Sequence, residues 1–174
     1  HDYHLHDTSP CTADNNPGCG QVGALGVGCG ATRYLVRPDG MGDFPTIADA
    51  VAACSDGDTI ELADGTFTGD GNRDIDFGGK QLYVSSQSGD PTSCIIDCGG
   101  TDTDYHRGFK FISGEGPSSI LEGVQIINAY VAWLDVGGAV RCNNASSPTI
   151  RNCIFAGNDA GGGSSVSCNN SSSP

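Results

Sequence analysis

A heptapeptide that recurs near the end of the sequence limits the possible folds more than any other feature. Cys142–Pro148 (CNNASSP) returns as Cys168–Pro174 (CNNSSSP), 26 residues later (168 − 142), with six of the seven positions identical. Val140 and Val166 lie two residues before the cysteine in the two copies, which fits a strand that leads into a turn. Short strands that return roughly every 20 to 30 residues, with Gly, Asn, Ser or Pro between them, indicate a solenoid.

Stacked coils would place equivalent side chains in continuous rows. Equivalent parallel strands lie about 4.8 Å apart, so we expect Val140 over Val166 and Cys142 over Cys168. A second set of counterparts extends the same pattern to neighbouring strands: Leu121 with Ile150, Val124 with Cys153, and Ile126 with Phe155.

Composition agrees with one β-rich domain. The 174 residues include 27 glycines and only 17% charged residues, which argues against a helical bundle. The chain has 8 basic and 21 acidic side chains, so it lacks the basic surface that is typical of nucleic-acid-binding proteins. No apolar run approaches the roughly 18 residues of a membrane span.

One segment is typical of a helix. Phe44–Cys54 offers Thr46 as N-cap and places four apolar residues on one face: Ile47, Ala50, Val51 and Cys54. This helix would cover one end of the solenoid. The segments 57–62 and 65–67 are expected to form a first strand and a turn.

Three motifs carry a family resemblance. Gly-Asp-Thr-Ile (57–60) follows the helix, and Ser-Ser-Pro-Thr-Ile (146–150) and Asn-Cys-Ile-Phe (152–155) lie in later coils. Together they resemble the pectate-lyase-like superfamily, and more closely secreted bacterial repeat proteins of unassigned function. The resemblance covers Tyr34 to Pro174 and implies an all-β fold, a right-handed parallel β-helix with a short N-terminal capping helix. It implies an architecture and no particular chemistry.

The order of segments is unusual. Residues 1–30 form a Gly/Cys-rich segment that resembles the end of such proteins, whereas residues 31–174 are expected to form a β-helix with an incomplete last coil. Two explanations fit: successive modules run head to tail along one longer chain, or a terminal segment completes the coil of a neighbouring subunit. Exposed strand edges at the end of a β-helix promote further pairing, so both explanations lead to a fibre.

No catalytic, cofactor or metal site is expected. Gly18–Gly23 matches a dinucleotide fingerprint in letters but lacks the strand and helix around it. His4 and His6 could hold zinc or copper, although an exposed polar strand explains them equally well. The carboxylates of 56–61 lack the pattern of an EF-hand and are expected in a structural turn.

The sequence also shows no set of residues that would catalyse the cleavage of a polysaccharide. The superfamily resemblance implies clustered carboxylates on one sheet, but Asp97 and Asp135 are isolated within their coils. His106 has no obvious partner for nucleophilic catalysis. Trp133 stands alone, so no aromatic stripe marks a sugar-binding groove.

Nine cysteines indicate an oxidising, extracellular location, and the odd number leaves at least one thiol free or paired with another chain. Cys94 and Cys98 could bridge to each other or to Cys54. The remaining candidates tie the front segment together: Cys11, Cys19 and Cys29.

Three asparagines are candidates for N-glycosylation, at Asn144, Asn169 and Asn170. The alternative is a pair of hydrogen-bonded ladders at the corners of the coils, Asn143 with Asn169 and Asn144 with Asn170.

Two functions remain. The first is an extracellular structural protein, not an enzyme, whose β-helix subunits polymerise head to tail with copies of themselves, with covalent glycans as further partners. In it, residues 1–30 dock on the coil that carries 168–174. The second is a β-helix that binds or degrades carbohydrate. The incomplete coil and the lack of a reactive cluster favour the first.

Overall fold

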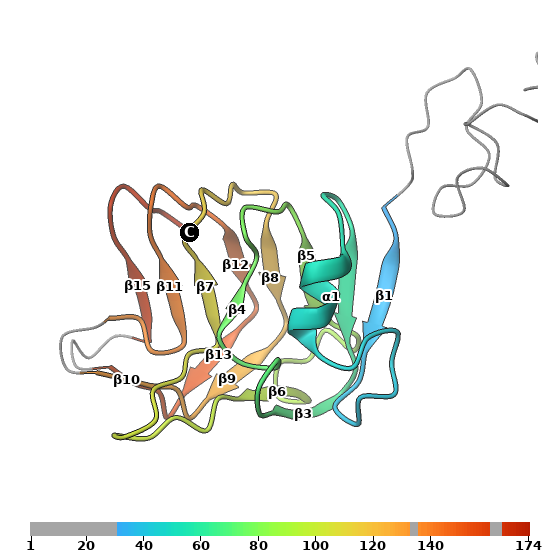
Figure 1. Ribbon diagram of the computed structural model, residues 1–174, viewed down its shortest axis with the longest axis horizontal. Helices are drawn as coiled ribbons and strands as arrows, with labels where there is room; N and C mark the ends of the chain where they lie inside the picture. Colours follow the sequence, from blue (N-terminus) through green and yellow to red (C-terminus); the bar gives the residue numbers. More distant parts are fainter. Residues whose placement is uncertain (1–30, 133–135, 161–164) are drawn as a thin grey trace, which may run out of the picture. The chain divides into compact units, whose positions relative to one another are not determined.

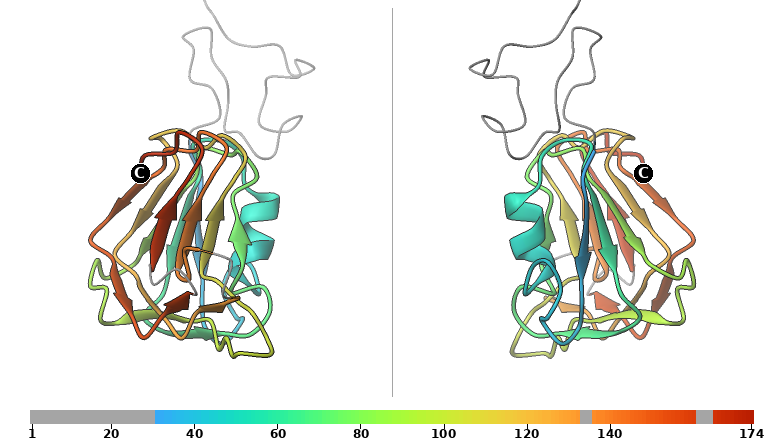
Figure 2. Two further views of the ribbon diagram at one scale, coloured as in Figure 1. Left: turned by 90° about the vertical axis from the view of Figure 1, so that its left-hand side faces the viewer. Right: turned by 90° about the vertical axis from the view of Figure 1, so that its right-hand side faces the viewer.

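The protein is a parallel β-helix. The computed structural model describes residues 31–132, 136–160 and 165–174, and the β-helix occupies the unit Arg33–Pro174. Its strands stack in parallel from one coil to the next and form three sheets that run along the coil axis (Figure 1). Viewed along that axis, the sheets enclose the core (Figure 2).

Each sheet collects one strand from each successive coil. Sheet A consists of β1 (Arg33–Val36), β2 (Thr59–Leu62), β5 (Tyr83–Ser86), β8 (Ile120–Glu122) and β12 (Thr149–Arg151). Sheet B consists of β3 (Gly65–Thr68), β6 (Cys94–Asp97), β9 (Gln125–Ile127) and β13 (Ile154–Ala156). Sheet C consists of β4 (Ile75–Asp76), β7 (Phe109–Phe111), β11 (Val140–Cys142) and β15 (Val166–Cys168). A small parallel pair comprises β10 (Tyr130–Val131) and β14 (Asp159–Ala160).

The predicted all-β parallel β-helix with one short helix is therefore confirmed for the described residues. Two details of the prediction were wrong. The first strand is β1, which precedes the helix, and the predicted turn at 65–67 belongs to the strand β3. Sequence propensity missed β3 because Gly65 opens it, at a φ of 132° that a side chain rarely adopts.

Single residues in the left-handed region turn the chain from sheet A to sheet B. Gly123 joins β8 to β9 at a φ of 69°, and Asn152 joins β12 to β13 at a φ of 50°. A Cβ atom on Gly123 would lie 2.6 Å from the Ser86 Oγ, so only glycine fits that corner, whereas asparagine tolerates the same backbone where there is space.

Rows of buried side chains fill the core. The predicted register is confirmed: Val140 pairs with Val166, and Cys142 with Cys168. The counterparts expected in the other two sheets also pair, Leu121 with Ile150 and Ile126 with Phe155. Four phenylalanines contribute the largest buried volume: Phe67, Phe77, Phe109 and Phe111. Because each row continues from coil to coil, removing one side chain affects contacts in two neighbouring coils.

The coils are less regular than the repeat suggested. Tyr83 of β5 pairs with Ile120 of β8, 37 residues later (120 − 83), which exceeds the expected spacing. The extra residues lie in the connections outside the strands, so the strands still stack in register while the sequence period is lost.

The helix α1 (Ile47–Ala53) closes one end of the β-helix, as predicted. The Thr46 side chain accepts a hydrogen bond from the Asp49 N–H at 3.2 Å, and Cys54 follows the last helical residue. The helix packs beside β4 and against β1 and β2, where sheet C would otherwise receive another strand (Figure 1).

Candidate functional site

The last coil of the described unit exposes the ends of the core rows. We use the name open coil for residues 149–160 and 165–168, which contain β12, β13 and β15. Ile150, Phe155 and Val166 are only half-buried, whereas the residues they pair with one coil earlier are fully buried. The left view of Figure 2 faces this end. The open coil therefore presents an apolar surface of the same pattern that each inner coil buries.

The backbone of the open coil also faces outward. Thr149 N–H donates to Ser119 O at 2.9 Å, and Ile154 N–H donates to Val124 O at 3.0 Å, both in the preceding coil. Peptide groups alternate in direction along a strand, so the next residues of β12 and β13 direct their N–H and C=O groups away from the body. Such an edge can receive a further strand.

The opposite end of the β-helix is closed. Leu35 in β1 donates its N–H to Asp43 Oδ2 at 2.7 Å and accepts the Asp43 N–H at 2.7 Å. These bonds occupy the outer edge of β1, and α1 covers the neighbouring side. The two ends of the described unit thus differ: the outer edge of β1 is bonded to Asp43, whereas the open coil bonds only to the coil before it.

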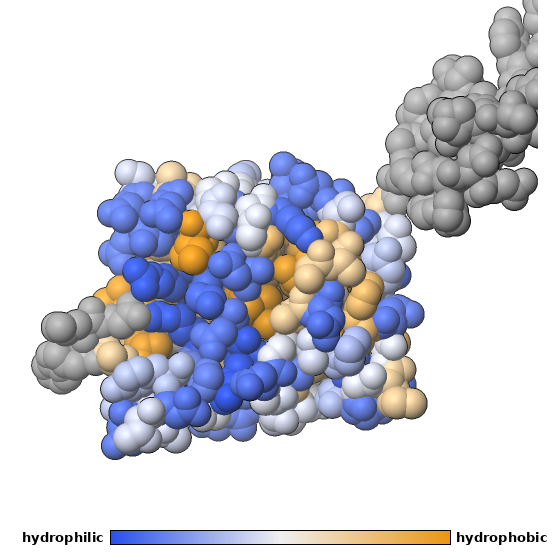
Figure 3. Space-filling view, in the orientation of Figure 1, coloured by the Kyte–Doolittle hydropathy of each residue, from blue (hydrophilic) through white to orange (hydrophobic). Residues whose placement is uncertain are grey.

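The outer faces of sheets A and C are mainly polar, whereas that of sheet B also carries Ile95, Ile127 and Ile154. On sheet A, Glu122 accepts from the Tyr83 hydroxyl at 2.5 Å and pairs with Arg151 at 2.7 Å. The Tyr83 and Arg151 hydrogen bonds hold the pKa of Glu122 below its usual value. On sheet C, Asp76, Lys110 and Arg141 stack in register, and Figure 3 shows hydrophilic residues across the middle of that face.

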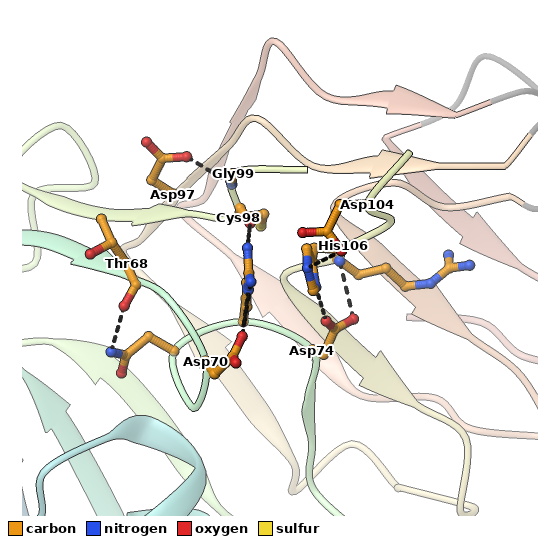
Figure 4. Close-up of polar contacts among 11 residues, drawn as sticks. Thr68, Asp70, Asp74, Asp97, Cys98, Gly99, Asp104 and His106 are labelled. Carbon is orange, nitrogen blue, oxygen red and sulfur yellow. Dashed lines mark hydrogen bonds and ion pairs between the residues drawn. The ribbon is translucent and has the colours of Figure 1, made fainter. Parts of the chain in front are cut away.

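The densest polar cluster lies between sheets B and C, where the turn after β3 meets the loop before β7 (Figure 4). The His106 Nδ1 lies 2.7 Å from Asp74 Oδ2, and its Nε2 lies 3.1 Å from Asp104 Oδ1. Asp74 also accepts the Arg107 N–H at 3.1 Å, and its own φ of 55° is unusual for a residue other than glycine. We call Asp74, Asp104, His106 and Arg107 the polar corner.

The polar corner joins neighbouring coils. The Nε2 atom of His106 is buried, so a substrate could not reach it, and the other ring nitrogen is engaged by Asp74. The buried Arg107 donates to the carbonyls of Val136 at 2.5 Å and Gly137 at 2.7 Å in the next coil. His106 has a carboxylate partner, Asp74, that was not obvious from the sequence, because it lies one coil earlier and no local sequence spacing indicates it.

The expected bridges among Cys54, Cys94 and Cys98 are absent, since all three are free thiols. Cys94 begins the strand β6 and Cys98 follows its end, so an extended chain separates them by about 13 Å, well beyond the reach of a disulfide. Burial raises the pKa of Cys94 and Cys98 to about 12, and that of Cys54 to about 11. These thiols belong to the core.

The asparagine corners form a cross-coil contact in a different pairing from the one expected. The Asn170 Nδ2 donates to Asn143 Oδ1 at 2.8 Å, while the Asn144 Nδ2 donates to Ile112 O at 2.9 Å and the Asn169 Nδ2 to Ser167 Oγ at 3.2 Å. The three acceptor candidates, Asn144, Asn169 and Asn170, are exposed. Glycosylation at these positions stays a prediction.

Other predicted residues serve the fold or lie outside the described residues. Asp56 accepts the Gln81 N–H at 2.9 Å, Asp58 accepts the Ser55 N–H at 2.8 Å, and Asp97 accepts the Gly99 N–H at 3.0 Å. Within residues 31–132, 136–160 and 165–174 no group of three metal-ligating side chains comes together, and no helix has the length and apolarity of a membrane span. The predictions that fall outside those residues concern His4, His6, Gly18–Gly23, Cys11, Cys19, Cys29, Trp133 and Asp135.

One groove relates to the carbohydrate alternative. It has a volume of about 420 Å³ beside the first coil. Its lining includes Asp39 and Asp64, but Asp39 pairs with Arg37 at 2.9 Å and Asp64 accepts the Ser88 hydroxyl at 2.6 Å. No aromatic side chain lines the groove, so a platform for stacking a sugar ring is missing there.

Comparisons with family models, with curated proteins and with solved structures found no match for this chain. The parallel β-helix is thus established by its own strand register. The finer resemblance to the pectate-lyase-like superfamily stays a prediction.

Proposed function

We propose that the protein is an extracellular structural subunit that assembles end to end, by adding a segment of a second copy to the open coil. The observation that carries the proposal is the contrast between the two ends. Ile150, Phe155 and Val166 leave the core rows half-exposed at one end, whereas α1 and Asp43 cover the other. Growth that uses two different surfaces is heterologous, and heterologous contacts that do not close produce filaments.

Residues 1–30 of the second copy are the proposed occupant of the open coil. The strand β1 at the closed end is not available to pair with the open coil of another copy, because Asp43 already forms hydrogen bonds with the outer edge of β1. Residues 20–25 (GQVGAL) contain no charge and no proline, so they are compatible with a strand added to an exposed edge. An oxidising location, glycans and the absence of catalysis belong to the same proposal.

The test compares two lysine variants of the full chain. Val166→Lys puts a charge on the half-buried row of the open coil, and Thr66→Lys adds the same charge to the exposed face of β3. Sedimentation velocity over a concentration series should show large species for the parent chain and Thr66→Lys, and mainly monomer for Val166→Lys. Equal assembly of both variants would contradict the proposal.

A peptide of residues 1–30 provides a readout that does not depend on how well a variant folds. An excess of this peptide should compete for the open coil and shorten the assemblies of the parent chain, whereas a scrambled peptide should not. Binding of acidic polysaccharide by a chain that stays monomeric, with no response to the peptide, would favour the carbohydrate alternative instead.

A further inference from the structure

Cys142 and Cys168 occupy equivalent positions in the last two coils. They are in-register partners of β11 and β15. Neighbouring parallel strands hold their Cα atoms about 4.8 Å apart, within the roughly 4.4–6.8 Å that a disulfide spans. Both are free thiols in this structure. Burial, and then the charge and hydrogen bond of Cys168, raise the pKa of Cys142 to about 12.

The other described cysteines lack such a partner in register. Cys94 and Cys153 lie beside Val124 on opposite sides, one coil before it and one coil after it, so a whole strand separates them. Cys54 and Cys98 lie in the first coils. Among the described cysteines, only Cys142 and Cys168 are in-register partners on neighbouring strands of which one is exposed to solvent.

The two thiols differ in exposure. Cys142 is completely buried and Cys168 is exposed on the edge strand. Among the described strands β15 pairs only with β11, so in this chain its Cβ atoms can shift toward those of β11 without disturbing an inner coil. A strand inside the sheet would not have this freedom.

We propose that Cys142 and Cys168 form a redox modification site, which a low-molecular-weight disulfide such as oxidised glutathione converts into an intramolecular cross-coil bridge. The Cys168 thiolate attacks one sulfur of glutathione disulfide, so a mixed disulfide forms and one glutathione thiolate leaves. The Cys142 thiolate then attacks the Cys168 sulfur, the cross-coil S–S bond forms, and the second glutathione leaves. Two protein thiols are oxidised and one glutathione disulfide is reduced to two glutathione molecules.

The bridge closes the loop between the two last strands of sheet C. The bridge lowers the conformational entropy of the state in which the last coil is detached. The last coil of the oxidised chain should therefore open less often. The buried Cys142 makes the second step slow at neutral pH, because only the thiolate attacks. The formation of the bridge should therefore speed up as the pH rises.

The test oxidises the full chain with glutathione disulfide and maps its peptides without reduction. An equal mixture of unlabelled and ¹⁵N-labelled chains separates bridges within one chain from bridges between chains. We expect a Cys142–Cys168 peptide without mixed labelling, a loss of two thiols, and about tenfold slower proteolysis of the last coil. Cys168→Ser and Cys142→Ser should each abolish all three effects.

Cys153→Ser is the matched control, because Cys153 also lies in the last coil and is half-buried. It should retain the bridge and the protection. A Cys168 that stays reduced or glutathionylated would overturn the inference, and so would a bridge from Cys168 to Cys11, Cys19 or Cys29. The oxidation is carried out at a dilution at which the chain is monomeric, because the proposed assembly would cover Cys168. The inference can therefore fail while the proposed function holds.

Discussion

Single polar side chains join coils that are far apart in the sequence. The buried Glu115 accepts the Gly79 N–H at 2.9 Å, the Ser113 N–H at 2.9 Å and the Ser146 hydroxyl at 2.7 Å. Burial alone raises the pKa of Glu115, but these hydrogen bonds outweigh it and hold the pKa below the usual value. The charged carboxylate is therefore a structural element of three successive coils.

Glu115→Gln should destabilise the protein by about 2 kcal/mol at neutral pH, because its amide group faces donors on every side. The folded pKa is lowered, so the stabilisation by Glu115 is complete above the unfolded pKa and is lost as the pH falls through the folded value. Urea unfolding at several pH values should show the difference between parent and variant shrinking in acid. A constant difference down to low pH would contradict this role.

Lys80 has a comparable role at the end of α1. Its Nζ donates to the carbonyls of Val51 at 2.7 Å, Ala52 at 2.9 Å and Cys54 at 2.8 Å. It thus satisfies the carbonyl groups that a helix leaves without partners at its C-terminus, and its positive charge opposes the helix dipole. No basic residue lies in the last turn of the helix itself.

Lys80→Met should lower the free energy of unfolding by about 2 kcal/mol, because three carbonyl groups lose a charged donor. Lys110→Met, on the outer face of β7, is the matched control and should change stability by less than about 0.5 kcal/mol. Both values come from urea unfolding at neutral pH. Equal effects of the two changes would show that the helix end does not need Lys80.

At the scale of strands, the same row of side chains is buried in the middle and open at its end. Leu121 in β8 is fully buried, whereas Ile150, which pairs with it from β12, is half-buried. Leu121→Ala should cost about 3 kcal/mol, and Ile150→Ala less than about half of that at concentrations where the chain is monomeric. Chemical unfolding of the two variants tests this. An equal cost in the monomer would mean that the open coil is already covered.

Sequence reasoning works well for strands that repeat and poorly for contacts between coils. The two copies of the heptapeptide predict the pairing of Val140 with Val166, because parallel stacking requires the same period in both strands. The helix was predictable from Thr46 and its apolar face. β3 was not, because its first residue is a glycine and its pairing with β6 supplies the stability that propensity lacks.

The candidate site was predictable in part for the same reason. The repeat predicts that Cys142 pairs with Cys168. It does not predict their exposure, because the burial of each thiol depends on whether another coil packs against it. Asp74 and His106 meet across one coil at different positions of an irregular turn, so no spacing in the sequence connects them. Cross-coil polar contacts require the structure.

At the scale of the whole molecule, the proposed assembly rests on the difference between the two ends of the described β-helix. One end is closed by α1 and by the bonds of Asp43 to β1, and the other presents half-exposed core rows and outward-facing strand edges. The outer face of sheet A between them is mainly polar and internally paired, as the Tyr83, Glu122 and Arg151 contacts illustrate. The proposed assembly therefore predicts association along the coil axis.

Electron microscopy of the full, unheated chain under non-reducing conditions tests this account most directly. Addition at one end predicts unbranched filaments, one β-helix wide, with a regular axial repeat, and Val166→Lys should yield short particles under the same conditions. Monodisperse single particles of the parent chain, at every concentration of a dilution series, would contradict end-to-end assembly.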